Sequence, residues 1–282
     1  MAVAHALLSR AKPLSGRVYW EVARRSFRRF ATYRSATAAG VFTNTVFGFL
    51  HAYVLLAVVT ERGEVGGLGP EGVVTFVFVT QGMLATVGAF GELDLSERIR
   101  TGDVVIDFHR PVDLQTYWLA QDLGRAGFQA LGRGIPPFLL GALIFDLMLP
   151  TSVWQWTAFV VSVALAVVVG FALRFIAALS GFWLLDARGA AQLMTAVTMF
   201  FSGFIIPINF FPEWLAQIAR LLPFVAVLQL PAEIFLGSGA GGVSGSGAIV
   251  ALATQLFWCV VLLGVGRRVL ARATRKVVAH GG

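Results

Sequence analysis

The chain has 282 residues, of which 57% are hydrophobic and 13% are charged, and its formal net charge is +7. A soluble domain of this length is about one quarter charged, because a surface that faces water needs ionised groups. The composition therefore argues against a soluble enzyme, a secreted domain and a disordered chain, and it indicates a surface that mostly faces lipid. The single cysteine, Cys259, lies within an apolar run and implies no intramolecular disulfide.

Six apolar segments are candidates for membrane-spanning helices, each of which needs about 20 mostly apolar residues. They cover residues 36–59, 73–90, 126–145, 156–185, 190–206 and 247–266. The fourth segment is too long for a perpendicular span, so we expect it to tilt or to project into the cytosol. The second and fifth are short and contain glycine, which favours packing against protein. The segments predict an all-α polytopic membrane protein with six transmembrane helices.

The basic residues indicate the orientation of these spans, since cations are retained on the cytoplasmic side of a membrane. Of the 22 Lys and Arg residues, all but Arg62 and Arg220 fall on the side that holds both chain ends, or on its approach. We therefore expect cytoplasmic termini, with a segment at 1–34, a membrane domain at 35–266 and a basic tail at 267–282. The high pI then reports orientation and contact with lipid headgroups, and it requires no nucleic acid as a partner.

The N-terminal segment has the pattern of an interfacial amphipathic helix, with an apolar face and a charged face at helical spacing. The apolar face holds Trp20, Ala23, Phe27 and Phe30, and the charged face holds Arg17, Glu21, Arg24 and Arg28. We expect this helix to lie parallel to the membrane, with its arginines among anionic headgroups. The alternative is a plain topology signal.

The connection at 91–121 is the longest polar stretch on the cytoplasmic side. Leu95 and Ile99 can form the apolar side of a short helix that ends at Gly102. The exposed side of this helix would carry Glu92, Glu97, Arg98 and Arg100. Two interpretations remain open: a docking element for a partner protein, and a solvated loop that only connects two spans.

Two motifs resemble those of the ABC-2 type transporter permeases. Ile99-Arg100-Thr101-Gly102-Asp103, followed by Phe108-His109-Arg110-Pro111, resembles the family's "I-x-x-G-x…L-x-[KR]-P" element, with Phe108 where Leu is usual. Residues 201–215, FSGFIIPINFFPEWL, resemble its "SG-x-x-[IL]-P-x-x-x-[FL]-P-x-W-[LI]" signature, and 221–224 and 230–237 extend the match. The resemblance covers nearly the whole chain, and it is to the subfamily whose six-span permease is separate from its ATPase.

The resemblance implies a site of coupling to ATP hydrolysis and a cap over the pathway. Residues 92–102 would form the coupling helix that enters a cleft of the ATPase, and the N-terminal helix would be the family's connecting helix. The coupling residues would be Glu92, Leu95, Glu97, Arg98, Ile99, Arg100 and Gly102. The segment 207–246 would form an extracellular re-entrant helical cap, since it is too rich in proline for one helix and too apolar for a loop. The residues that mark the cap are Pro207, Pro212, Trp214 and Pro223.

The resemblance also implies a function and partners. The chain would be the permease subunit of an ATP-driven exporter in the bacterial inner membrane, with two ABC ATPase subunits and a second permease, identical or paralogous. The substrate would be lipophilic or amphipathic, such as a drug, a natural product, a lipid or a glycolipid. The alternatives are a channel or scaffold that works without an ATPase, and an intramembrane transferase.

The sequence carries no strong motif for a nucleotide, a metal or catalysis. No G-x-x-x-x-G-K-[ST] occurs, so ATP and Mg²⁺ are expected on the partner ATPase and no cofactor on this chain. Gly237, Gly239 and Gly242 match G-x-G-x-x-G, but they lie in a Gly/Ser loop. The histidines have no neighbouring ligands at metal-binding spacing, so we expect no metal site. We also expect no catalytic residues on this chain.

A few residues within the spans are candidates for the transport pathway or its gate. Arg174 lies inside the fourth span, where an ionisable side chain normally faces protein or water; the alternative places it at headgroup level. Asn44 either lines the pathway or forms an interhelical hydrogen bond. Phe200, Phe201 and Phe204, near the outer end of the fifth span, form either a hydrophobic gate at a dimer interface or ordinary apolar contacts.

Overall fold

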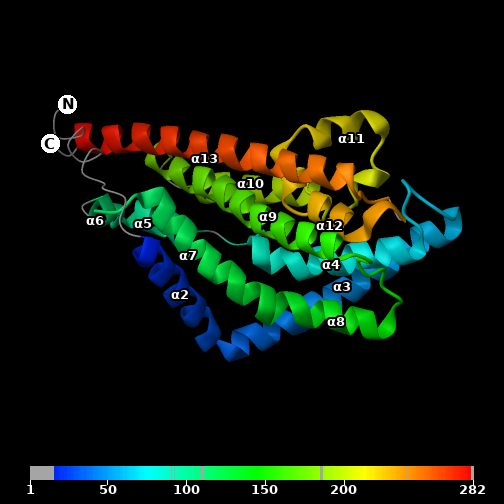
Figure 1. Ribbon diagram of the computed structural model, residues 1–282. Coiled ribbons are helices and arrows are strands. Elements are labelled where there is room, and N and C mark those ends of the chain that lie inside the picture. The colour runs from blue at the N-terminus through cyan, green and yellow to red at the C-terminus, as the bar shows by residue number, and fades with distance from the viewer. Residues whose placement is uncertain are drawn as a thin grey trace.

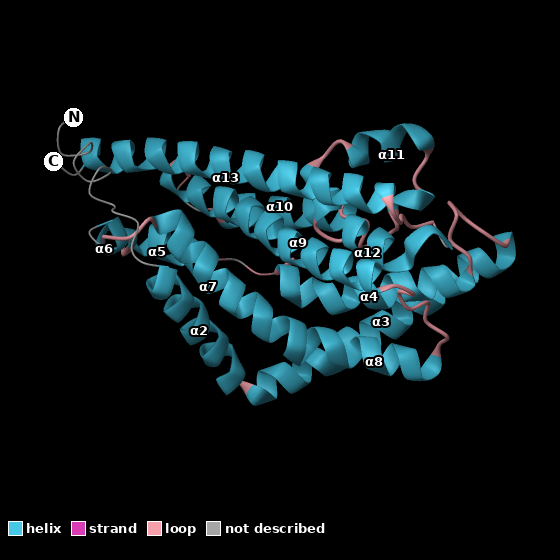
Figure 2. Ribbon diagram, viewed as in Figure 1, coloured by secondary structure: helices cyan, strands magenta, loops and turns pink. Residues whose placement is uncertain are grey.

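Every regular element in the described part of the chain is a helix, apart from one isolated bridge between Val65 and Leu68 (Figures 1 and 2). The computed structural model describes residues 16–280, except 90, 92, 109, 110, 185, 186 and 240. The predicted all-α fold class is confirmed, and several of the helices are strongly apolar, as in helical membrane proteins.

Four of the described helices are long and apolar enough to cross a membrane, judged by length and composition. They are α3 (Arg34–Arg62), α4 (Pro70–Val87), α9 (Val153–Leu179), which continues as the 3₁₀ turn η2 (Ser180–Phe182), and α13 (Ser246–His280). They correspond to the first, second, fourth and sixth predicted spans and support a multi-pass membrane protein. The basic tail is not a separate segment, because α13 continues through it as far as His280.

The third predicted span belongs to a longer and irregular helix. Its parts are α7 (Leu114–Gln129), the π-helical turn η1 (Ala130–Gly134) and α8 (Ile135–Ile144). Asp113 caps the start of α7 by accepting a hydrogen bond from the Thr116 backbone at 2.8 Å, well before the predicted start at residue 126. Pro136 and Pro137 have no N–H to donate to the preceding turn, which explains the interruption at η1.

The fifth predicted span is shorter than a bilayer. Its helix α10 (Arg188–Phe201) has 14 residues and is therefore about 21 Å long, against about 30 Å for a hydrocarbon core. The number of six spans therefore stays a prediction. Beyond α10 the chain forms a series of short helical elements. They are η3 (Ile208–Phe210), α11 (Glu213–Arg220), η4 (Pro223–Ala226), α12 (Gln229–Leu236) and η5 (Gly237–Gly239).

Prolines determine where these short elements begin, because proline fits the first positions of a helix and cannot continue the helix before it. Pro207 precedes η3, Pro212 precedes α11, and Pro223 is the first residue of η4. The helices agree with the helical character expected of the cap, which we define as residues 207–246. Its position on the outer side of the membrane stays a prediction.

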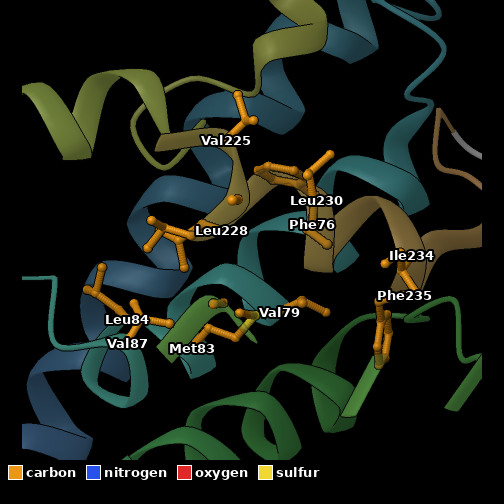
Figure 3. Packing of buried hydrophobic residues seen from close by; sticks show 14 of the residues in the cluster. Phe76, Val79, Met83, Leu84, Val87, Val225, Leu228, Leu230, Ile234 and Phe235 are labelled. Atoms are coloured by element: carbon orange, nitrogen blue, oxygen red, sulfur yellow. The ribbon is translucent and has the colours of Figure 1, made fainter. Parts of the chain in front are cut away.

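The short helix α12 lies at the centre of the core at the cap end. All of its residues are buried, and it contacts α4, α9 and α13. Figure 3 shows its side chains and those of α4 gathered in one apolar layer, with Leu230 above Phe76. Gln155 of α9 donates to the carbonyls of Ile234 and Phe235 at 3.2 and 2.7 Å. These bonds satisfy carbonyls that a helix of two turns cannot pair itself.

The opposite end of the bundle, toward which the C-terminal end of α13 points, holds three further elements (Figure 1). They are α2 (Gly16–Thr32), α5 (Asp94–Thr101) and α6 (Val104–Phe108). We call this the α5 end. α2 lies along α7, where Phe27 meets Phe128 edge to face with ring centroids 5.7 Å apart. The aromatic face predicted for lipid therefore packs partly on α7, while Trp20 stays 71% exposed.

The packing of α2 on α7 depends on Gly124. A Cβ added there would lie 2.7 Å from the Ala23 carbonyl carbon, closer than atoms approach without a shift. Gly→Ala in a helix normally stabilises by up to about 1 kcal/mol, but Gly124→Ala should lower the apparent melting temperature of the detergent-purified chain and expose α2 to proteolysis. Gly127→Ala is the matched control, since its Cβ would meet Phe27 at an ordinary 3.6 Å. Equal melting temperatures for the two variants would contradict the close approach.

Candidate functional site

The last turn of α4 carries backbone carbonyls that the helix itself cannot pair. Arg125 of α7 donates to the carbonyls of Ala85 at 2.7 Å and Thr86 at 3.0 Å. Arg174 of α9 donates to the carbonyl of Val87 at 3.1 Å. Two guanidinium groups from different helices therefore cap the C-terminus of α4, where positive charge also suits the helix dipole.

Asp122 of α7 holds these two guanidinium groups together. Arg125 Nε donates to its carboxylate at 2.7 Å, and Arg174 Nη2 donates at 2.9 Å. The side chains of Asp122, Arg125 and Arg174 are only 2%, 15% and 11% exposed. Burial alone would raise the pKa of Asp122, but the two arginines outweigh burial and lower that pKa. We call Asp122, Arg125 and Arg174 the carbonyl clamp.

Glycine residues make room for the carbonyl clamp. Gly88 ends α4 in the left-handed conformation (φ 70°), and a Cβ there would lie 2.7 Å from the guanidinium carbon of Arg174. A Cβ on Gly170 of α9 would lie 2.8 Å from the Val87 carbonyl oxygen. α4 and α9 therefore meet almost backbone to backbone at this level.

The helix α5 is anchored beside the carbonyl clamp. Leu95 is fully buried in a cluster that includes Phe171 and Phe175 of α9. Arg29 of α2 donates to Asp94 at 2.8 Å, and this hydrogen bond raises the pKa of Arg29. α5 is thus attached to α9 by apolar contact and to α2 by an ion pair, and it follows α4 after a short connection.

Part of the predicted coupling set faces the interior of the protein. Leu95 is buried, and Ile99 lies against Gly181 of η2. Arg98 donates to Asp107 of α6 at 2.6 and 3.1 Å, and the Asp107 side chain is only 2% exposed. Arg98 therefore connects α5 to α6 and is a structural residue of this segment.

The rest of the described coupling set faces outward. Arg100 Nε donates to Glu97 at 2.9 Å on the exposed side of α5, and this bond lowers the pKa of Glu97. Gly102 ends α5 in the left-handed conformation (φ 83°), as the sequence predicts. Glu92, the first residue of the predicted set, lies outside the described residues. Glu97 and Arg100 thus lie on the exposed side of α5, and their role in coupling stays a prediction.

The predicted gate residues gather at the end of α10 and pack on the cap. Phe200 stacks on Phe211 with ring centroids 5.2 Å apart, and Phe201 stacks on Phe224 at 6.3 Å. Phe204 lies 5.8 Å from the ring of His51 of α3. These rings connect α10 to the cap and to α3.

The other predicted pathway residues lie elsewhere. Arg174 belongs to the carbonyl clamp at the α5 end, and its charge is paired with Asp122. Asn44 is partly buried on α3. The structure therefore does not bring the five pathway candidates into one site.

A second polar cluster, which the sequence did not indicate, holds the cap together. Glu233 of α12 has a side chain that is 3% exposed, and Arg220 of α11 pairs with it at 2.8 Å. Gln229 donates to Glu233 at 2.9 Å and to Asn209 at 2.7 Å. Arg220, one of the two cations that departed from the charge asymmetry, is thus explained as the counter-charge of a buried acid.

Of the residues predicted to mark the cap, Pro207 and Pro223 are buried, and Trp214 is 64% exposed.

Asp122 and Arg125 were not among the predicted site residues, although an acidic and a basic residue three positions apart are able to pair on a helix. The charge asymmetry of the sequence assigns Arg133 to the cytoplasmic cations. In the structure Arg133 lies in η1, and its guanidinium group covers Gly40 of α3, where an added Cβ would overlap it. Its Nε atom is buried and has no hydrogen-bond partner in the part of the chain that the structure describes. Arg133 therefore lies against α3, and the side of the membrane to which it belongs stays a prediction.

An apolar cavity of about 290 Å³ lies between α4, η1, α8, α9 and α12. Phe235 of α12 forms one wall, where it meets Phe138, Trp156 and Phe159 edge to face at 5.6, 5.6 and 4.9 Å. Aromatic walls with few polar groups suit an apolar ligand or acyl chain. Among the residues described, no group of three or more His, Cys, Asp and Glu side chains is placed to hold a metal ion.

Removal of the negative charge of Asp122 from the carbonyl clamp should destabilise the chain strongly. Asp122→Asn keeps the size of the side chain but leaves two buried guanidinium groups without a counter-charge, which typically costs about 3–5 kcal/mol. We expect a clear fall in the apparent melting temperature of the purified chain. Glu21→Gln is the control, because Glu21 forms only exposed ion pairs with Arg24 and Arg25. A fall no larger than that of the control would count against the clamp.

Comparison with known protein families shows to which family this chain belongs. The family model described as ABC-2 family transporter protein matches residues 45–281, a range that contains the carbonyl clamp, α5 and the cap. A search of curated proteins gives no match. Since the family model covers most of the chain, the resemblance seen in the two sequence motifs is confirmed. The chain belongs to the ABC-2 transporter family and is a membrane-embedded transport component of that type.

Proposed function

We propose that this chain is the permease subunit of an ATP-driven exporter and that α5 is its coupling helix. The observation that carries the proposal is the attachment of α5: its apolar side is buried on α9, and the chain that leads into it comes directly from the clamped end of α4. A force on the exposed side of α5 would therefore act on two of the long apolar helices at once.

The carbonyl clamp makes this attachment stiff. Movement of α4 away from α9 would leave the Val87 carbonyl without its donor, and movement of α7 away from α9 would separate Asp122 from Arg174. Both changes expose buried charge or unpaired backbone to a poor solvent, which is costly. A displacement of α5 is therefore expected to move α4 and α9 as a unit.

The proposed partners follow from what the chain contains and exposes. The sequence has no nucleotide-binding motif, so two ABC ATPase subunits would bind ATP and Mg²⁺. α3 presents Phe42, Phe47 and Leu50, which are 70%, 60% and 58% exposed, to lipid or to a second permease, identical or paralogous. The family resemblance is our reason to propose the bacterial inner membrane as the location, and the charge asymmetry favours both termini in the cytoplasm.

The proposed substrate class is lipophilic or amphipathic: a drug, a natural product, a lipid or a glycolipid. The aromatic cavity of about 290 Å³ supports this class, because its lining offers almost no polar partner for a hydrophilic solute. Export from the cytoplasm or the inner leaflet is the direction we propose.

A charge exchange on α5 tests the coupling role. The double variant Glu97→Arg with Arg100→Glu keeps an ion pair within the helix but reverses the order of charges on the exposed side. We expect transport per ATP hydrolysed to fall at least about tenfold in proteoliposomes. The coupling energies measured for close charge pairs across an interface correspond to more than a tenfold change in affinity. The apparent melting temperature should not change.

Glu213→Arg is the control for this experiment, since it also reverses an exposed acid but lies on α11 at the cap end. Purification in mild detergent adds an independent measurement, in which an ATPase should co-elute in stoichiometric amount. Unchanged coupling in the double variant would refute the docking role of α5. Reproducible absence of an ATPase would refute the exporter, and product formation without ATP would indicate a transferase.

A further inference from the structure

A small cavity of about 80 Å³ with several charged lining residues lies between α2, α5, α7, α9 and the end of α4. Its walls include the guanidinium-bearing residues Arg29, Arg125 and Arg174, and the carboxylates of Asp94 and Asp122. Three cations and two anions face one small space, so the wall carries a net positive charge. The volume suffices for several waters or for one small anionic group.

Two residues of this wall carry a buried hydrogen-bond donor without a partner. The hydroxyl of Ser26 on α2 and the indole N–H of Trp118 on α7 are both without a hydrogen bond in the part of the chain that the structure describes. Each residue is only 5% exposed. A buried donor without an acceptor is unfavourable, so two of them beside one cavity indicate that an acceptor belongs there.

The arginines of the wall also retain donors. A guanidinium group has five N–H bonds, and Arg29 uses one of them on Asp94. Arg125 donates from each of its three nitrogens, to Asp122, Ala85 and Thr86, which leaves two N–H bonds. Both carboxylates of the wall already accept from arginine. The cavity therefore has an excess of donors, and it suits an anion with several acceptor oxygens.

The cavity lies at the level expected of lipid headgroups. Arg174 comes 21 residues after Val153, the first residue of α9, and Arg267 comes 21 residues after Ser246, the first residue of α13. Each distance is about 32 Å along a helix, close to the thickness of the hydrocarbon core. The two helices meet at this level, where a Cβ on Gly266 would lie 3.3 Å from the ring of Phe175.

We propose that this cavity binds a phosphate group, supplied by an anionic phospholipid headgroup or by free phosphate. Ser26, Trp118 and Arg29 donate hydrogen bonds to its oxygens, and Arg125 and Arg174 contribute charge from the carbonyl clamp. The bound group connects α2 to α7 and α5. The site does not depend on the proposed export activity, because it follows from donors and charge within this chain.

Thermal-shift titration of the full-length chain in a neutral detergent tests the site, with inorganic phosphate and short-chain phosphatidylglycerol as separate probes and short-chain phosphatidylcholine as the zwitterionic comparison. At least one anionic probe should raise the melting temperature in a saturable manner. Ser26→Ala and Trp118→Phe should each weaken its apparent Kd about tenfold, the usual effect of losing a hydrogen bond to a charged group. Ser26→Ala is the smaller change, so it keeps the test valid if Trp118→Phe folds poorly.

Arg28→Gln is the matched control, since Arg28 is exposed on the same helix and lies outside the cavity. The Arg28→Gln substitution removes one exposed positive charge and so lowers the general attraction of the chain for anions. It should leave the Kd of the saturable site within about twofold of the Kd of the unaltered chain. Saturation by phosphatidylglycerol alone assigns the site to a headgroup, and saturation by both anions assigns it to any phosphate group. Two results overturn the proposal: no saturable effect of either anion, or Ser26→Ala and Trp118→Phe with unchanged affinity. The latter would leave the cavity with water only.

Discussion

Three backbone carbonyls at the end of α4 determine how the α5 end of the molecule is built. Lipid offers no donors to such groups, and α4 is enclosed by α7 and α9, so the protein has to supply them. The carbonyl clamp does this from two different helices, and Asp122 pairs with both arginines. One local requirement of α4 therefore places three helices relative to one another. Gly170 allows α9 to approach closely enough to meet that requirement.

The cap end meets a similar requirement with different residues. α12 is too short to pair its own terminal carbonyls, and Gln155 of α9 donates to them. Its buried acid Glu233 is paired with Arg220 and accepts from Gln229. Between the two ends, residues 72–81 of α4 are all buried in a mostly apolar layer. Many of the buried charges and amides thus lie at two levels, which is the arrangement that a hydrocarbon layer favours.

The long apolar helices were predictable because their signal is local: a run of about 20 apolar residues predicts a span wherever it packs. The start of α7 was not, since residues 114–125 are too polar for lipid and are covered by α2 and α9, which composition alone does not reveal. The pairing of Asp122 with Arg174 in the carbonyl clamp left no pattern either, because the two residues are 52 positions apart. Arg98 was expected to face a partner, and its pairing with Asp107 depends on the turn at Gly102 that lies between them.

These contacts also decide which helices can move relative to each other. α4, α9 and α12 share one packed layer, and their separation would take the Val87 carbonyl from Arg174 at one end and expose α12 at the other. Packed layers of this kind shift as bodies and do not deform gradually. α3 packs along this layer through α4, where Gly48 lies close enough to Phe78 that an added Cβ would come within 3.4 Å of the ring. In a permease driven through α5, the α4–α9–α12 layer would therefore move as one body, with α3 in contact along its side.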